Sequence, residues 1–200
     1  MQLFDEIIFW LSGGLMIPVV LGVLYLLITG LLSIGKFYGL YFNRSKYNKL
    51  LKENLNPKQL DLEKITQADS TSKTLLGSAM AEIIEAKHSE IIREKIIADF
   101  EVACERELDK HRTLAKMGPI LGLMGTLIPM GPALGGLSEG DITTMSEQMQ
   151  IAFNTTVLGL VIGCIGFLLL QTKQRWFTQD LNQLDFLNNL IAENYEKDTK

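Results

Sequence analysis

The side chains that could do chemistry in this 200-residue sequence are a few hydroxyl and amide groups in otherwise apolar surroundings. Thr126 lies in one such stretch, and Asn154, Thr155 and Thr156 lie together in the next. A hydroxyl donates to an ionised carboxylate and accepts from a protonated one, without adding a fixed charge. Inside a membrane, polar groups of this kind usually face a helix-bundle interior or a wet cavity. A purely structural role is equally open for each threonine, because its hydroxyl can bond to a carbonyl one turn back in its own helix.

No arrangement of residues indicates catalysis or metal binding. His88 and His111 lie in a charged segment without Cys or His partners at metal-ligand spacing, so we interpret both as solvated surface residues. The segment 122–125, Gly-Leu-Met-Gly, lies in an apolar stretch, where glycines more often let helices approach than bind phosphate. We therefore expect no enzymatic activity, no metal and no cofactor.

Three stretches without a charged residue must position these groups. They run from Ile7 to Gly35, from Met117 to Ser138 and from Gln148 to Thr172. A helix needs only about 20 such residues to cross a bilayer. The sequence therefore predicts an all-α integral membrane protein with three transmembrane helices. The first stretch is preceded by acids and is too long for a cleaved signal peptide, so we expect it to remain as an anchor.

The basic residues indicate how the chain is oriented. Of the 19 Lys and Arg residues, 15 lie in segment 36–116 and the other 4 lie from residue 173 onward. The positive-inside rule places both segments in the cytoplasm, so the N-terminus lies outside and the C-terminus inside. The formal net charge is −4, and the basic residues are interleaved with acids, so no nucleic-acid partner is expected.

Four segments follow from this topology. Residues 1–35 form the external N-terminus and first span, and 36–116 form a cytoplasmic helical loop. Residues 117–172 hold the second and third spans, and 173–200 form a cytoplasmic C-terminal helix. Apolar residues recur at helical spacing over 73–116, so most of this part is predicted to be helix that runs almost directly into the second span. Short helices joined by turns are predicted over 52–72.

The C-terminal helix carries an apolar stripe that needs a partner. Its members are spaced three or four apart, namely Phe177, Leu181, Leu184, Leu187, Ile191 and Tyr195. Either the 73–116 helix or a neighbouring copy of the chain could cover it, and the pattern alone leaves both open.

Glycines form smooth faces on the second and third spans, at Gly118, Gly122 and Gly125 and at Gly159, Gly163 and Gly166. Such faces let helices pack by backbone approach. A lone three-helix chain would not easily cover these faces together with the C-terminal stripe, so a homo-oligomer is expected. Replacing Gly159 or Gly163 with leucine should then weaken the complex.

Two motifs resemble a known family. Residues 118–126, Gly-Pro-Ile-Leu-Gly-Leu-Met-Gly-Thr, resemble the "(A/G)P-hydrophobic-LGLLGT" opening of the second helix in the MotA/TolQ/ExbB proton-channel family. Residues 155–160, Thr-Thr-Val-Leu-Gly-Leu, are similar to the "ATAIGL" or "GTFLGI" core of its last helix. The motifs cover about 117–170, and the three-span topology is that of TolQ and ExbB, whereas MotA proteins have four spans.

The resemblance implies an architecture and a mechanism. It implies a pentamer of this chain in the cytoplasmic (inner) membrane around a dimer of a single-span partner of the MotB, TolR or ExbD type. The protonatable Asp would belong to the partner, and flow of H⁺, or alternatively Na⁺, would drive mechanical work. Thr126 and Thr156 would form the polar ring of the ion path, with Thr155, Asn154 and Glu147 as weaker candidates.

The chain departs from the family pattern at two places. ExbB and TolQ carry a Glu five residues before the third-helix Thr, where this chain has Ile151, and Glu147 is one turn farther out. This difference favours a MotA-like or divergent member. The outer hairpin, from Pro129 through Pro132 to Asp141, is also unlike the common pattern, since it places two prolines near the outer half of the second span. No function is assigned to these prolines.

Two other function classes compete with an ion-driven motor subunit. A non-conducting scaffold of the same fold could organise a partner complex, and it would differ in whether Thr126 and Thr156 face a shared interior beside a partner acid. A solute-transporter subunit ranks lowest, because the chain lacks internal charges and broken-helix symmetry. The process that is driven is left open.

Overall fold

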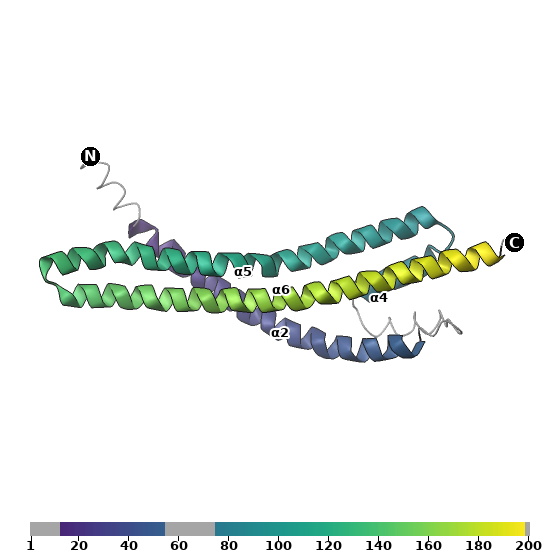
Figure 1. The fold of residues 1–200 in the computed structure, drawn as a ribbon, viewed down its shortest axis with the longest axis horizontal. Helices are drawn as coiled ribbons and strands as arrows, with labels where there is room; N and C mark the ends of the chain where they lie inside the picture. Colours follow the sequence, from purple (N-terminus) through teal and green to yellow (C-terminus); the bar gives the residue numbers. More distant parts are fainter. Residues whose placement is uncertain (1–12, 55–74, 199–200) are drawn as a thin grey trace. The chain divides into compact units, whose positions relative to one another are not determined.

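A computed structural model describes residues 13–54 and 75–198, and these residues form four α-helices (Figure 1). The helices are α2 (Met16–Asn54), α4 (Leu75–Glu85), α5 (Glu90–Glu139) and α6 (Ile142–Asp198). The described residues contain no strand, so the all-α prediction is confirmed. The short helices predicted over 52–72 lie outside the described residues, apart from 52–54, which end α2.

The chain divides into two compact units. One, here called the span unit, consists of Met1–Gly35 and Lys110–Leu170; the other, the charged unit, consists of Lys36–Asp109 and Gln171–Lys200. Three of the described helices are long and apolar enough to cross a membrane, within Met16–Tyr41, Glu90–Glu139 and Ile142–Glu193. The prediction of three transmembrane helices is therefore confirmed by length and composition.

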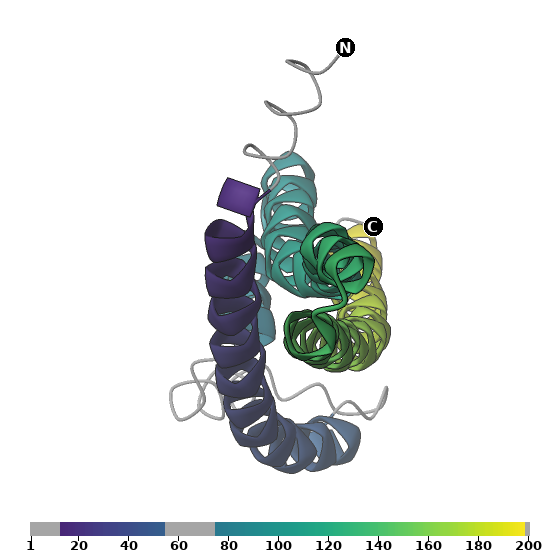
Figure 2. The same cartoon turned by 90° about the vertical axis from the view of Figure 1, so that its left-hand side faces the viewer.

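A tight turn joins the two long helices of the span unit, where α5 and α6 lie side by side and antiparallel (Figures 1 and 2). Gly140 adopts φ +78°, which side chains disfavour. The Asp141 carboxylate then caps α6 by accepting hydrogen bonds from the Thr144 N–H at 3.1 Å and the Thr144 hydroxyl at 2.5 Å. These bonds lower the pKa of Asp141.

Pro129 and Pro132 lie in the outer part of the second span, as expected from its charge-free length. α5 continues through Pro129 and Pro132 to Glu139, and the turn itself is only Gly140 and Asp141. Prolines are tolerated inside membrane helices when neighbouring groups satisfy the carbonyls that they free.

The predicted 73–116 helix is interrupted at residues 86–89, between α4 and α5. Arg93 holds this break: its side chain is buried and donates to the Lys87 carbonyl at 2.8 Å and to Asn188 Oδ1 at 2.7 Å. Helical spacing in the sequence does not reveal such a break, because the apolar pattern resumes on the other side. Ile91, whose spacing in the sequence fits the apolar pattern, is 80% exposed just after the break.

The core of the charged unit brings α4, α5 and α6 together. Its buried members are Leu76, Ala79, Met80 and Ile83 of α4, Phe100 and Cys104 of α5, and Leu184, Leu187 and Ile191 of α6. Phe177 and Leu181 pack against it. The C-terminal stripe is thus covered within the chain by the 73–116 segment, which is one of the two alternatives that the sequence leaves open. The side chain of Tyr195 lies outside those described. The stripe is therefore no argument for an oligomer.

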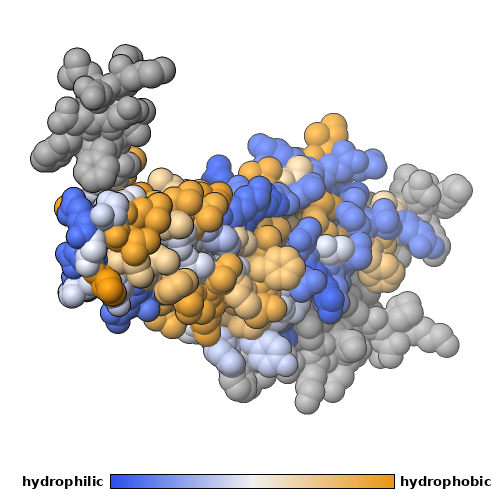
Figure 3. All heavy atoms as spheres, turned by 60° about the vertical axis from the view of Figure 1, so that its left-hand side comes forward, coloured by the Kyte–Doolittle hydropathy of each residue, from blue (hydrophilic) through white to orange (hydrophobic). Residues whose placement is uncertain are grey.

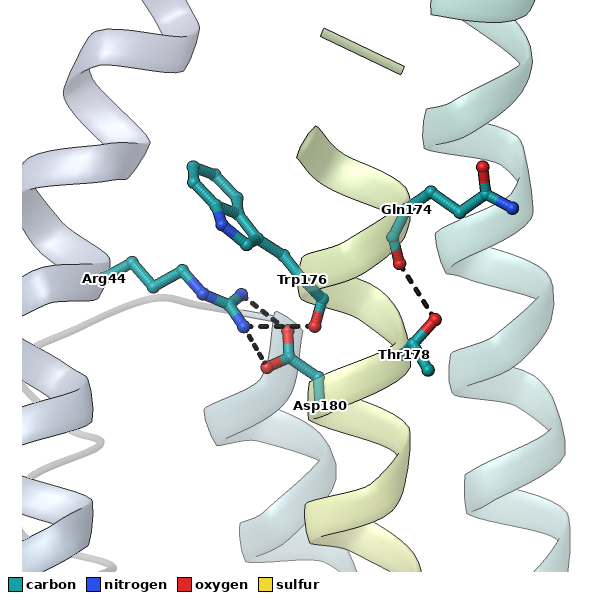
Figure 4. Close-up of polar contacts among 5 residues, drawn as sticks. All are labelled: Arg44, Gln174, Trp176, Thr178 and Asp180. Carbon is teal, nitrogen blue, oxygen red and sulfur yellow. Dashed lines mark hydrogen bonds and ion pairs between the residues drawn. The ribbon is translucent and has the colours of Figure 1, made fainter. Parts of the chain in front are cut away.

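A buried ion pair ties α2 to α6 in the charged unit (Figure 4). The two terminal guanidinium nitrogens of Arg44, Nη1 and Nη2, donate to the Asp180 carboxylate at 2.7 and 2.5 Å, and Nη2 also donates to the Trp176 carbonyl at 3.1 Å. The Arg44 guanidinium lies 5.1 Å from the Trp176 ring centroid, and Phe37 stacks on the same ring at 5.0 Å. We call these four residues the Arg44 clamp.

For the ionised Asp180 carboxylate, the cost of desolvation is larger than the stabilisation by Arg44. Its pKa is raised, since desolvation outweighs the hydrogen bonds and the charge of Arg44. A carboxyl with a raised folded-state pKa favours the folded state most when protonated, and that contribution is lost as pH rises through this pKa. At neutral pH, the pair therefore holds α2 in a defined place more than it adds net stability.

We predict that Asp180→Ala destabilises the charged unit by about 3–5 kcal/mol, because the largely buried Arg44 charge is left without its partner. The double variant Arg44→Met/Asp180→Leu should return to within about 1 kcal/mol of the original chain. Thermal unfolding followed by circular dichroism in detergent measures both. Thr178→Val is the matched control, since the Thr178 hydroxyl bonds only locally to the Gln174 carbonyl (Figure 4). A double variant as unstable as the single one would contradict this account.

Candidate ion-path site

The two backbones of α5 and α6 touch along a glycine seam in the span unit, formed by Gly118, Gly122 and Gly125 on α5 and Gly159 and Gly163 on α6. A Cβ atom added at Gly159 would lie 2.6 Å from both the Gly118 oxygen and the Gly122 Cα. One added at Gly118 would lie 2.8 Å from the Gly159 oxygen. These neighbours are backbone atoms that cannot rotate away, so glycine is required for this approach.

The seam continues toward the start of the second span. A Cβ atom at Gly163 would lie 2.6 Å from the Pro119 ring, and one at Gly166 would meet the backbone of Leu114 and Ala115. The glycines expected to join separate copies thus pack within one chain. A substitution there acts on the hairpin before it can act on any oligomer.

α2 covers one side of this hairpin. Val23 packs with Leu114 and Ile162 in a buried cluster. A Cβ atom at Gly22 would lie 3.2 Å from Leu121 Cδ1. This cluster holds the first span against both others.

Much of the span surface is apolar and exposed, and the orange region in Figure 3 shows part of it. In the most apolar stretch of each of the three spans, only 17%, 28% and 33% of the stretch is buried inside the chain. Among the exposed side chains are Leu123, Leu127 and Leu134 of α5 and Phe153, Val157 and Leu160 of α6. A surface of this kind suits lipid or further membrane helices.

The two principal candidates lie on facing helices near the seam. The Thr156 hydroxyl is half-buried and lies 3.3 Å from both the Gly122 carbonyl of α5 and the Ala152 carbonyl of its own helix. The Thr126 hydroxyl donates at 2.7 Å to the Leu123 carbonyl, on a more exposed face. Both Thr156 contacts are long, so this hydroxyl is only weakly engaged.

The weaker candidates divide sharply. Asn154 and Glu147 are exposed, and Ile151 is half-buried. Thr155, in contrast, is 7% exposed, and its hydroxyl lies 2.9 Å from the Gly125 carbonyl across the seam. The sequence interpretation ranked Thr155 below Thr156, yet it makes the tighter contact between the helices.

The expected surface position of His111 is wrong, whereas His88 is exposed as expected. His111 is 3% exposed because it shares a helix face with Leu108 and Leu114, three residues before and after it, which are also buried. Among residues 13–54 and 75–198, no group of three or more His, Cys, Asp or Glu side chains could hold a metal ion.

We predict that Gly159→Ala lowers the stability of the chain by about 1–3 kcal/mol or more, since the new methyl group overlaps the α5 backbone. Gly135→Ala is the matched control: it lies in α5 with open space around its Cβ position, so it should be neutral or stabilising by up to about 1 kcal/mol. Thermal unfolding in the same detergent compares the two. Equal stability of both variants would mean that the helices do not approach as described.

Comparison with known proteins connects this site to a family. The MotA/TolQ/ExbB proton channel family matches residues 59–185, more than half of the chain. Motility protein A of Borreliella burgdorferi is 26% identical over 152 residues, which cover 70% of this chain and 57% of that protein. The chain thus matches little more than half the length of this relative. The family match includes the whole glycine seam and both principal threonines, and the chain belongs to the MotA/TolQ/ExbB proton channel family.

Proposed function

We propose that this chain is the ion-channel and stator subunit of a membrane complex that couples ion flow to mechanical work. The observation that carries the proposal is the family match over 59–185, which includes both hydroxyl-bearing spans. The chain itself has no enzymatic activity and needs no cofactor in this proposal, because its substrate is the transported ion, H⁺ or alternatively Na⁺.

The carboxylate of the ion path comes from a partner. Segments 117–138 and 148–172 contain no acid or base, so neither span can take up and release a proton by itself. A single-span protein of the MotB, TolR or ExbD type would bring an Asp into the path. The weakly engaged Thr156 hydroxyl can turn toward this carboxyl group, donating to its ionised form and accepting from its protonated form.

The assembly is a pentamer of this chain around two copies of the partner. Its support is the family match together with the large exposed apolar surface of the spans, of which a single chain buries at most a third. The glycine seam and the C-terminal stripe do not support it, since the chain covers both itself.

The chain lies in the cytoplasmic membrane with its N-terminus outside and its C-terminus inside. All 19 basic residues flank the spans on one side, which supports this orientation. We predict that a reporter fused after Lys200 is cytoplasmic and that one inserted at Glu139 is external. Paired reporters active on opposite sides of the membrane test this, and an internal Glu139 would overturn the three-span topology.

The function is tested by purifying the chain from its native membrane with its bound partner and reconstituting the complex in liposomes. We predict a complex of five copies and two partners by native mass spectrometry, with H⁺ or Na⁺ flux down an imposed gradient. Thr156→Val keeps the side-chain shape but removes the hydrogen bond, so it should abolish flux and leave the mass of the complex unchanged.

Thr29→Val is the matched control, because the Thr29 hydroxyl lies in the first span and bonds to the Tyr25 carbonyl of its own helix at 2.8 Å. It should conduct like the original complex. Full flux through the Thr156→Val complex would refute the polar ring. An intact original complex that conducts neither ion would favour the scaffold function instead.

A further inference from the structure

A proline inside α5 leaves one backbone carbonyl of the span without its usual partner. In an α-helix, the N–H of residue 129 would donate to the carbonyl of Gly125, four residues earlier. Pro129 has no N–H, and its side chain is fully buried. Within a membrane no water is present to replace the missing donor, so another group must supply it.

Thr155 of α6 supplies that donor. Its hydroxyl lies 2.9 Å from the Gly125 oxygen, although the two residues are 30 positions apart. The same hydroxyl lies 3.0 Å from the Ile151 carbonyl and 2.9 Å from the Ala152 carbonyl. Those two carbonyls belong to the uninterrupted α6, where helix N–H groups already serve them. Because a hydroxyl carries one proton, the Gly125 carbonyl is the acceptor that most needs it.

Gly125 makes this approach possible. A Cβ atom at Gly125 would lie 2.6 Å from the Thr155 hydroxyl oxygen. A side chain at position 125 would therefore push Thr155 away from the carbonyl. Three residues therefore act together. Pro129 leaves the Gly125 carbonyl without its backbone donor, the missing side chain of Gly125 gives access to this carbonyl, and the Thr155 hydroxyl donates to it.

We propose that Thr155 is a positioning residue of the ion path, which locks the rotation of α6 against α5 through the carbonyl that Pro129 frees. Successive residues of a helix are about 100° apart, so fixing Thr155 also fixes the direction of its neighbour Thr156. Thr156 then lies over the Gly122 carbonyl, one turn before Gly125. The effect of the lock on conduction rests on the proposed function, whereas the lock itself does not.

The lock assigns different roles to the two adjacent threonines. Thr155 is buried in the seam and acts on the backbone of α5. Thr156 keeps only long contacts and stays available to a mobile carboxyl group. Thr155 therefore determines where the Thr156 hydroxyl lies, and the Thr156 hydroxyl forms the hydrogen bond to the partner's carboxyl group.

A double variant tests this lock directly. Pro129→Ala restores an N–H that can serve the Gly125 carbonyl, so the Thr155 hydroxyl is no longer needed. We expect Thr155→Val to lower the melting temperature by roughly 5 °C and to reduce ion flux severalfold. Thr155→Ser keeps the donor and should behave like the original chain. Thr155→Val/Pro129→Ala should recover both melting temperature and flux, which a mere loss of packing at position 155 would not allow.

The carbonyl itself can be observed. Gly125–Thr126 is the single Gly–Thr pair in the sequence, so ¹³C-carbonyl glycine with ¹⁵N-threonine isolates its signal in solid-state NMR of the complex. The signal should shift in Thr155→Val and return in Thr155→Ser and in the double variant. A signal that does not move in Thr155→Val, or a double variant without recovery, overturns the lock. If the signal follows the expected order but the original complex conducts no ion, the lock stands and the proposed function fails.

Discussion

The close approach of α5 and α6 is the constraint on which the rest of the span unit depends. Gly118 and Gly122 face Gly159 without a side chain between them, so the two backbones are in direct contact. This contact brings the hydroxyls of Thr155 and Thr156 within reach of carbonyls on the opposite helix. Polar groups of one helix thereby form hydrogen bonds with the other helix. This matters because the bilayer core has no water that could form these bonds instead.

The same constraint accounts for Pro129 in α5. A proline in a lone membrane helix would leave a carbonyl unsatisfied, whereas here Pro129 lies against a helix whose threonine fills the gap. The backbone hydrogen bond that α5 lacks at Pro129 is therefore replaced by one from α6, and the two spans behave as one hairpin. α2 packs on one side of it, and much of the remaining apolar surface is exposed.

In the charged unit, specific polar partnerships set the helix positions around an ordinary apolar core. Arg93 fixes the break between α4 and α5, and the Arg44 clamp fixes α2 on α6. Burial raises the pKa of the Asp180 carboxyl despite its arginine partner, so this pair specifies geometry more than it stabilises. Burial likewise raises the pKa of the Cys104 thiol to about 12, which keeps it protonated and unreactive.

The sequence by itself determined the all-α class, the three spans and the family, because charge-free length and the motifs at 118–126 and 155–160 are local properties of the chain. Tertiary structure alone decided which helix covers which face. Periodicity shows that a face is apolar but does not identify its partner. The sequence therefore reveals neither the burial of His111 nor the helices that cover the C-terminal stripe. The sequence shows that position 129 lacks a backbone N–H donor, because it is a proline. Only the packing of α6 reveals that the Thr155 hydroxyl replaces this donor, since Pro129 and Thr155 lie on different helices.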